Sequence, residues 1–325
     1  MNMTMFRFRV AQNSMEPNLS PGDEFVATNS RPARRGEIVA TPHPHRDDFW
    51  LVKRLTGLAG ERVSTDVTIP ERKAWVLSDS SRTDSVDSRT FGPVDFDTLH
   101  PVVTQLDEVT FAEGVDLLTA EDDRLRTVVE QFSTPLFWHR PPGFATLVLL
   151  ILEQQVSLES GAAVFGRLVA ATGAVTPENI QGFGEQALNA IGLTRQKAGY
   201  VTGLARDVIT GRIDLEAIGA MPDDLALAML ESVKGIGPWT AQAYLLSAER
   251  RPDLFPIGDR ALQVGTGEAL ELSSPPTGED LEMLAEPWRP IRSVAARILW
   301  HGYLARRGRV EPQHPLSVQE RPETA

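Results

Sequence analysis

The 325-residue sequence contains no cysteine. Disulfide bonds and thiolate-held iron–sulfur clusters are therefore excluded for it. Long apolar runs are also missing: the longest, Phe144 to Leu152 with Thr146 inside, is too short to span a bilayer. The first ten residues, MNMTMFRFRV, lack the apolar stretch and cleavage site of an export signal. The sequence therefore predicts a cytoplasmic protein.

Basic residues are too few to dominate the charge. The net charge at pH 7 is −12, which argues against a protein that coats nucleic acid non-specifically. Between residues 230 and 310, however, ten basic side chains balance ten acidic ones. DNA binding by this part of the chain would rest on backbone N–H groups and a few arginines, with a strong dependence on salt.

Two regions differ in their apolar patterning, and the chain is long enough for two separate cores. In residues 1–100 the short apolar segments EFVA, GEIVA, FWLVKRL, RVS and AWVL alternate with turns, which predicts a small all-β barrel or sandwich. After a loosely patterned linker over residues 101–117, helical spacing dominates residues 118–308 and predicts an all-α domain. The polar residues 309–325 predict a disordered tail.

The stretch from Leu230 to Asp259 has the clearest pattern of the helical region. One helix ends near Val233, Gly235-Ile236-Gly237 forms a turn, and Thr240 caps or begins the next helix. Glycine allows a positive φ and the close approach of another surface, and a helix N-terminus behind it presents free N–H groups. We therefore predict that Gly235, Gly237 and Thr240, helped by Lys234, bind DNA at a phosphate. The turn alone is equally typical of an ordinary helix–helix connection.

An aspartate, Asp259, ends the loop that begins at Phe255, about twenty residues after the hairpin. A Gly-hydrophobic-Gly hairpin followed at this distance by an aspartate resembles the helix-hairpin-helix DNA glycosylase superfamily. Residues 118–308 are most similar to its 3-methyladenine DNA glycosylase II group, and Gln-Gln-Val-Ser at 154–157 resembles the segment near its DNA-intercalating loop. The resemblance implies base excision repair, with Asp259 as the catalytic carboxylate and Gln154 at the DNA. Without the resemblance, Asp259 would be interpreted as the N-cap of the helix that follows it, and Gln154 as a polar residue at a helix end.

The residue that follows the hairpin bears on the type of reaction. A carboxylate near the sugar stabilises the positive charge that develops as the N-glycosidic bond breaks. Superfamily members that also cut the DNA backbone carry a lysine two residues after the second hairpin glycine, where this chain has Trp239. The resemblance therefore implies a monofunctional N-glycosyl hydrolase for alkylated purines, and we expect no metal or other cofactor. Aromatic faces would hold the cationic base. The pocket candidates, each of which is also a plausible core aromatic, are Trp239, Trp300, Trp138 and Tyr303.

Three boxes in the N-terminal region, Asn13–Asp23, Arg35–Glu61 and Val76–Val94, carry a second resemblance. In order and spacing they resemble the signal peptidase I family, which implies a serine–lysine dyad with Ser14 as nucleophile and Lys53 as general base. Lys53 lies on an apolar strand, where burial would lower its pKa as a base requires.

The third box matches the family only in part. Ser85, Asp87 and Arg89 fall where the family positions its lysine, but Ser78-Asp79-Ser80 replaces the usual Gly-Asp-Asn. Gln12 stands two residues before the nucleophile, where a hydroxyl often assists the oxyanion hole. Without a visible membrane anchor, the region looks more similar to short soluble members such as the maturation protease of nickel superoxide dismutase. The structural alternatives are that Ser14 is an ordinary serine in a turn and that Lys53 is a solvated lysine at a strand edge.

Three functions fit these patterns. Our main hypothesis is a monofunctional alkylbase DNA glycosylase joined to a signal-peptidase-like Ser/Lys region. Its partners would be double-stranded DNA with alkylated bases and a peptide or protein substrate, with no membrane. The alternative is a maturation serine protease whose helical half only binds DNA or a partner. The third is a non-catalytic DNA-binding protein in which both sites have decayed.

Overall fold

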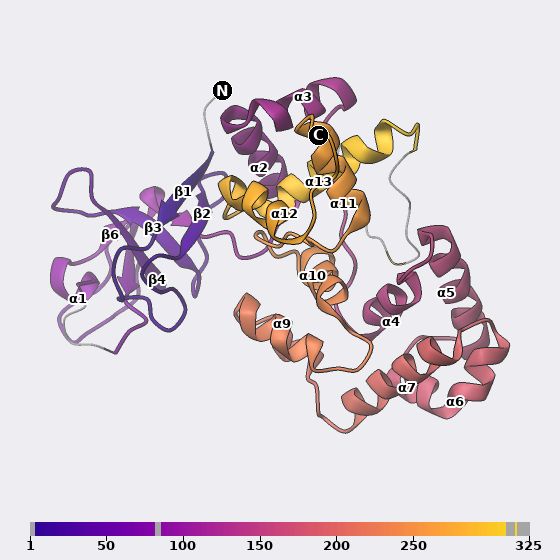
Figure 1. The fold of residues 1–325 in the computed structure, drawn as a ribbon. Helices are drawn as coiled ribbons and strands as arrows, with labels where there is room; N and C mark the ends of the chain where they lie inside the picture. Colours follow the sequence, from indigo (N-terminus) through magenta and orange to yellow (C-terminus); the bar gives the residue numbers. More distant parts are fainter. Residues whose placement is uncertain (1–3, 82–85, 310–315, 317–325) are drawn as a thin grey trace, which may run out of the picture. The chain divides into compact units, whose positions relative to one another are not determined.

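The computed structural model describes residues 4–81, 86–309 and 316. The chain divides into two compact units, Met1–Leu117 with Arg289–Ile291 and Leu118–Trp288 with Arg292–Ala325. The strands lie in the first unit and most helices in the second, as the colours along the chain show (Figure 1). This order confirms the predicted fold class, a β region followed by a helical one. The predicted tail at 309–325 lies outside the described residues except for Arg309 and Leu316.

Antiparallel strands build the N-terminal unit. They are β1 (Met5–Arg9), β2 (Glu24–Thr28), β3 (Ile38–Pro42), β4 (Trp50–Leu58), β5 (Lys73–Leu77), β6 (Val94–Asp95) and β7 (His100–Pro101), with the short helix α1 (Ser88–Phe91) and the 3-10 turn η1 (Phe96–Thr98) between them. β1 pairs with β2, and the other strands form one sheet in the order β6-β5-β4-β3-β7. The predicted strand at residues 62–64 was wrong, because there Arg62 makes only an isolated bridge to Thr68.

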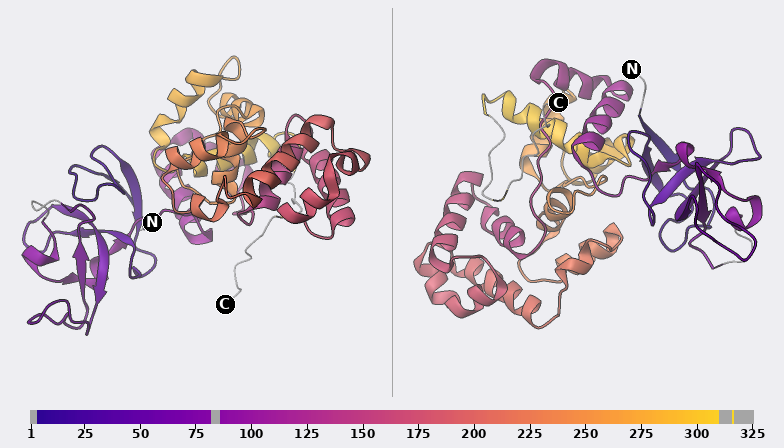
Figure 2. Two further views of the ribbon diagram at one scale, coloured as in Figure 1. Left: turned by 90° about the horizontal axis from the view of Figure 1, so that it is seen from below. Right: turned by 180° about the vertical axis from the view of Figure 1, so that it is seen from behind.

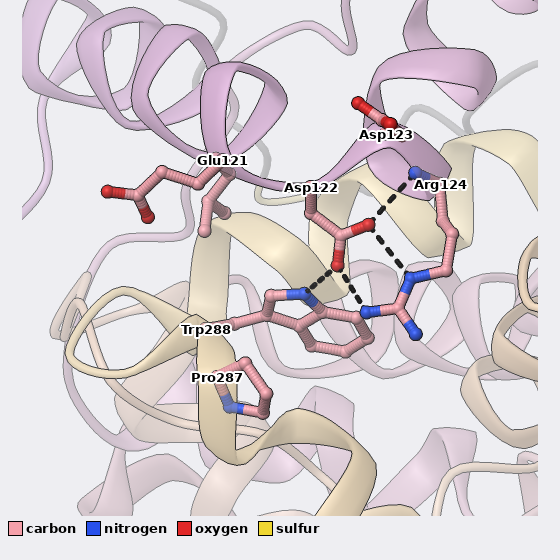
Figure 3. Close-up of a pocket in the computed structure, with 7 residues that line it drawn as sticks. Glu121, Asp122, Asp123, Arg124, Pro287 and Trp288 are labelled. Atoms are coloured by element: carbon pink, nitrogen blue, oxygen red, sulfur yellow. Dashed lines mark hydrogen bonds and ion pairs between the residues drawn. The ribbon is translucent and has the colours of Figure 1, made fainter.

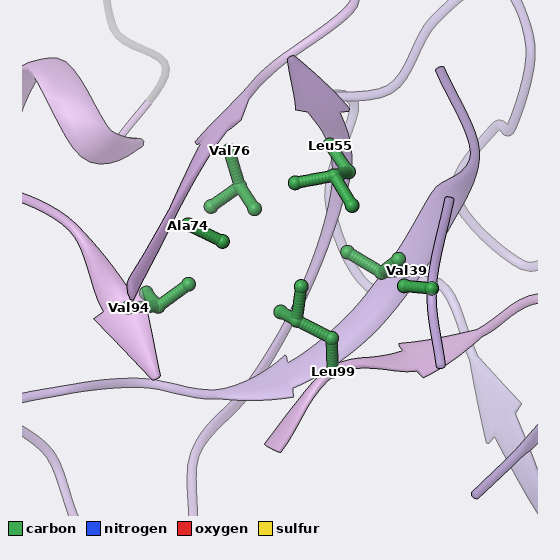
Figure 4. Close-up of a cluster of buried hydrophobic side chains, with 7 residues drawn as sticks. Val39, Leu55, Ala74, Val76, Val94 and Leu99 are labelled. Atoms are coloured by element: carbon green, nitrogen blue, oxygen red, sulfur yellow. The ribbon is translucent and has the colours of Figure 1, made fainter. Parts of the chain in front are cut away.

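The long strand β4 explains why a lysine is buried in this sheet. Its side chains alternate, so Leu51, Lys53 and Leu55 are buried while Arg54 is half-buried between them, as the two-residue period of a strand requires. Lys53 is only 3% exposed. The apolar cluster that anchors this sheet consists of Ala33, Val39, Leu55, Ala74, Val76, Val94 and Leu99 (Figure 4).

Helices make up the second unit. They are α2 (Glu108–Glu121), α3 (Asp123–Phe132), α4 (Phe144–Glu153), α5 (Leu158–Thr172), α6 (Pro177–Ala190), α7 (Arg195–Ile209), α8 (Leu215–Ile218), α9 (Asp223–Glu231), α10 (Pro238–Ser247), α11 (Arg260–Ala269), α12 (Gly278–Ala285), the 3-10 turn η2 (Glu286–Trp288) and α13 (Arg292–Ala305). The prediction of a loose linker over 101–117 was wrong from residue 108 onward, where α2 begins. Among the described residues, no helix is both long and apolar enough to cross a membrane.

Helix α4 lies at the centre of one group of helices. Nine of its ten residues are buried, and it packs against α5, α7 and α10. The helices α5, α6 and α7 lie side by side in every view (Figures 1 and 2). A second group forms where α13 packs against α3 and α11. The two groups therefore bring α10, α11 and α13 to the positions from which the site is built.

A polar cluster at the start of α3 holds η2, the turn that leads into α13. The Asp122 carboxylate accepts hydrogen bonds from the Arg124 guanidinium and from Trp288 Nε1, the latter at 2.9 Å (Figure 3). Burial raises the pKa of Asp122, but these hydrogen bonds outweigh it and lower the pKa to about 2. The described lining of the cavity beside the cluster, about 440 Å³, includes neither the hairpin residues nor Asp259. We assign the cluster a structural role.

Candidate functional site

The two hairpin glycines have different backbone conformations. Gly235 has φ +99°, and a Cβ added there would lie 2.3 Å from the ring of Tyr200. Glycine is therefore required at this position both by φ and by the close approach of Tyr200. Gly237 is extended, with φ −100° and ψ 179°, and an added Cβ would meet no atom within 4 Å. Gly237 is also exposed, so its open side can accept an approaching ligand.

The N-terminus of α10 presents unused donors. Within the described chain, the N–H groups of Gly235, Gly237 and Trp239 donate to no other group, and Pro238 between them has no N–H. The exposed Lys234 adds a positive charge next to them. Such a group of free N–H donors at a helix N-terminus suits an anion such as a phosphate.

Gln154 ties this hairpin to the end of α4, and Lys197 of α7 ties the same end of α4 to α7. Gln154, the C-cap of α4, donates from Nε2 to Gly235 O and to Thr240 Oγ1, both at 2.9 Å. Lys197 Nζ donates to the carbonyls of Leu152 and Gln154 at 2.7 and 2.9 Å, and its burial lowers its pKa. Thr240 is only 2% exposed. Its side chain therefore braces the hairpin, and its contact with DNA stays a prediction.

Three N–H groups converge on the carboxylate of Asp259. Trp300 Nε1 donates to Oδ1 at 3.0 Å and Trp239 Nε1 to Oδ2 at 2.9 Å. Oδ1 also accepts the backbone N–H of Leu262 at 2.8 Å, so Asp259 is the N-cap of α11. The interpretation of Asp259 as an N-cap is thus correct for Oδ1. The indole N–H groups of Trp239 in α10 and Trp300 in α13 bind the same carboxylate. Asp259 is half-buried, which leaves the carboxylate open to a ligand.

The other two predicted aromatics, Trp138 and Tyr303, each pack against an arginine. The Arg297 guanidinium lies 3.7 Å from the centroid of the Trp138 ring. The Arg307 guanidinium lies 3.8 Å from the centroid of the Tyr303 ring. A face already covered by a cation is unsuited to a second cation. Arginines of the same unit therefore cover one face of each ring, and the pocket role of Trp138 and Tyr303 stays a prediction.

In the N-terminal unit, Lys53 Nζ donates a hydrogen bond to Ser14 Oγ at 2.6 Å. Burial lowers the pKa of Lys53 to about 8, although the charges of Asp87 and Asp79 act in the opposite direction. The structure thus joins the two predicted dyad residues, and their catalytic role stays a prediction.

Two acids of the third box, Asp87 and Asp79, act on Lys53 through their charges. Asp87 is fully buried and accepts hydrogen bonds from the Arg89 guanidinium and from the backbone N–H of Ser78. Burial raises the pKa of Asp87, but these bonds outweigh it and lower the pKa. Asp79 is held by Arg54, whose Nε lies 2.7 Å from Oδ1. Ser85 lies outside the described residues.

A cleft of about 510 Å³ opens at the dyad. Its described lining consists of Ala11, Gln12, Asn13, Ser14, Pro21, His43, Arg46, Phe49, Leu51, Lys53 and Val86. Three of these residues, His43, Arg46 and Phe49, come from the loop between β3 and β4, and the sequence reasoning missed them. Their mixed cationic and aromatic composition was visible in PHPHRDDFW, but only the folded loop shows that they face Ser14.

Comparison with known protein families agrees with both regions. Residues 148–290 match the HhH-GPD superfamily base excision DNA repair protein family. This range holds the hairpin and Asp259, whereas Trp300 lies beyond it. Residues 1–68 match the signal peptidase, peptidase S26 family and include Ser14 and Lys53.

Individual relatives match only parts of the chain. A DNA-3-methyladenine glycosylase of Bacillus subtilis is 32% identical over 110 residues, which are 34% of this chain and 36% of the relative. Mitochondrial inner membrane protease subunit 2 of Mus musculus is 33% identical over 113 residues, which are 30% of this chain and 64% of the relative. The chain spans between 36% and 59% of the length of three curated glycosylase relatives.

A solved structure shares the helical fold. The 3-methyladenine DNA glycosylase of Schizosaccharomyces pombe, in complex with abasic DNA, superposes with a TM-score of 0.54 at 22% identity, covering 58% of this chain and 95% of that one. In its family and sequence matches, the chain thus combines an alkylbase DNA glycosylase-like region of the HhH-GPD superfamily with an N-terminal segment of the peptidase S26 type, and this solved structure agrees with the helical fold of the former.

Proposed function

We propose that the helical region is a monofunctional DNA glycosylase that releases alkylated purines from double-stranded DNA. The observation that carries the proposal is the Asp259 carboxylate, which Trp239 and Trp300 hold by their indole N–H groups. A fixed carboxylate stabilises the positive sugar that forms as the base leaves and orients the attacking water. Purines alkylated at N3 or N7 carry a positive charge and leave easily, so they need little further assistance.

DNA would bind chiefly through the hairpin. The free N–H groups of Gly235, Gly237 and Trp239, with Lys234 beside them, suit one phosphate of the backbone. Gln154 holds this turn and thereby acts on DNA through the hairpin. The faces of Trp239 and Trp300 remain our candidates for contact with the flipped base.

The test is a base-release assay on methylated duplex DNA with the full chain. We expect free 3-methyladenine, identified by mass spectrometry, and abasic sites with an intact backbone until alkali is added. Borohydride should trap no covalent protein–DNA product, because Trp239 stands where a Schiff-base lysine would be needed. Binding of the duplex without release of any methylated base would overturn the proposal and favour a region that only binds DNA.

We propose peptide-bond hydrolysis as a second activity, because the Ser14–Lys53 hydrogen bond and the lowered pKa of Lys53 suit a serine–lysine dyad. Ser14 Oγ would bond to the peptide carbonyl carbon while neutral Lys53 takes its proton. That proton would pass to the leaving amine, and water would then hydrolyse the acyl ester. Cleavage of a protein or peptide by the full chain that stops with Ser14→Ala tests this activity. The cytoplasmic location expected from the sequence stays a prediction.

A further inference from the structure

The cleft at Ser14 and Lys53 has an uneven charge. Its described lining contains the cations Arg46 and Lys53 and the imidazole of His43, but no carboxylate. The two carboxylates whose charges act on Lys53 are outside the described lining, and each is engaged by an arginine: Asp79 by Arg54 and Asp87 by Arg89. A cleft lined by one sign of charge attracts ligands of the opposite sign.

Arg46 differs from the arginines around it. Arg54 and Arg89 each make paired hydrogen bonds to a carboxylate. Among the described residues, Arg46 has no carboxylate within ion-pair distance, and its guanidinium lies 5.6 Å from the ring centroid of Phe49. Its charge acts inside the cleft: burial is the main cause that lowers the pKa of His43, and the charges of Arg46 and His45 add to it.

The rest of the cleft suits a peptide. Phe49 and Val86 are 39% and 46% exposed, and Leu51 and Pro21 add further apolar surface. Apolar walls with a few placed polar groups are typical of ligand clefts of this size. A guanidinium with free N–H groups prefers a carboxylate, which it can bind with two parallel hydrogen bonds.

We propose that this cleft selects peptide segments that carry an acidic side chain close to the bond presented to Ser14, and that Arg46 is the residue that determines this specificity. Cleavage of such segments rests on the second activity proposed above, but the binding preference does not. The two can therefore be tested separately.

The binding test uses the full chain with Ser14→Ala, so that no peptide is consumed. The probes are fluorescent octapeptides of alanine and valine with one glutamate at each position in turn, matched by a set with glutamine. We expect glutamate to bind about tenfold more tightly at one or two adjacent positions, as one charge-assisted pair provides. Arg46→Gln should abolish the difference, and Arg46→Glu should reverse it, so that the glutamine peptides bind more tightly than the glutamate peptides.

The matched control is Arg34→Gln, which removes one exposed arginine that lies outside the cleft lining; it should leave the preference intact. Equal binding of the two sets, absence of binding, or a preference that survives Arg46→Gln would overturn the inference. Displacement of the peptides by a single-stranded oligonucleotide in an Arg46-dependent way would also overturn it, since the cleft would then be a phosphate site.

Cleavage by the wild-type chain separates this inference from the activity on which it partly rests. An Arg46-dependent acidic preference in binding, without any cleavage, would support the inference and contradict the peptidase activity. Cleavage of glutamate and glutamine peptides at equal rates would support the peptidase activity and contradict the inference.

Discussion

Trp300 donates its indole N–H to the carboxylate of Asp259 at 3.0 Å, from a residue 41 positions further along the chain. Trp239 donates to the other oxygen at 2.9 Å. The two tryptophans therefore act on the aspartate through their N–H groups, separately from any stacking by their rings. This distinction can be tested, because phenylalanine keeps an aromatic face and removes the donor.

We predict that Trp239→Phe and Trp300→Phe each slow base release in a single turnover by about tenfold, since each loses a hydrogen bond to a charged group. Affinity for an undamaged duplex should stay within about threefold, because the hairpin donors that suit a phosphate are untouched. Trp138→Phe is the matched control, and its rate should equal that of the wild type. A slow Trp138 variant with normal Trp239 and Trp300 variants would contradict the assignment.

The hairpin glycines should respond differently to alanine. Gly235→Ala places a Cβ at φ +99° and against the Tyr200 ring, so we expect a loss of about 1–3 kcal/mol in the free energy of unfolding and weaker duplex binding. Gly237→Ala adds its Cβ in open space at an ordinary φ and should change stability by less than about 0.5 kcal/mol. Thermal unfolding measures both variants, and equal melting temperatures would speak against this geometry.

Gln154 should act on DNA through the hairpin. Gln154→Leu removes the hydrogen bonds to Gly235 O and Thr240 Oγ1 while it keeps a side chain of similar size. We expect faster hydrogen exchange of the bonded hairpin amides, which are Ile236 N–H to Val233 O and Ala241 N–H to Gly237 O, and a loss of about 1–2 kcal/mol in stability. The same change at Gln181, which is exposed on α6, should affect neither. Unchanged exchange in the Gln154 variant would mean that the brace is dispensable.

The lowered pKa of Lys53 predicts that both the peptidase activity and the stability of the folded chain depend on pH. Because only neutral lysine can accept a proton, peptidase activity should rise as the pH passes about 8 and then level off. The pKa of Lys53 is about 8 in the folded chain and near the ordinary 10.5 when unfolded. Between these values the unfolded chain binds more protons, so the folded state gains stability as the pH rises.

The comparison that isolates the lysine uses Lys53→Met. Subtracting the stability of this variant from that of the wild type removes the contributions of all other titrating groups. The difference should grow in favour of the wild type between about pH 8 and pH 10.5. A difference in stability that does not change over this range would contradict the lowered pKa and indicate that Lys53 is a solvated surface residue.

Patterns of period two and of helical spacing predict most elements of the fold, because they depend only on which face of each element is buried. In β4 the same alternation that buries Leu51 and Leu55 also buries Lys53. The start of α2 was missed, since Pro101 and scattered acids hide the helical spacing that begins at Glu108.

The candidate sites could be predicted only in part. Motif resemblance led to Asp259, Trp239 and Trp300 and to Ser14 and Lys53, and the structure brings each of these sets together. The sequence does not tell which aromatic face is already covered, because Arg297 lies 159 positions from Trp138. Contacts of this range depend on tertiary packing, as does the loop that brings Arg46 to the cleft.

The central claim is that Asp259 is the carboxylate that drives base release. The most direct measurement is the single-turnover rate on a methylated duplex for the wild type and Asp259→Asn, with duplex affinity measured beside it. Asparagine keeps the shape and the capping oxygen but removes the charge. Asp280→Asn, the same change at an exposed position of α12, is the control.

We predict that Asp259→Asn loses on the order of 10²–10³-fold in rate, as the removal of a preorganised electrostatic contact costs, while duplex affinity stays within about threefold and the Asp280 variant matches the wild type. A rate for Asp259→Asn equal to that of the wild type would contradict the account and leave Asp259 as the N-cap of α11.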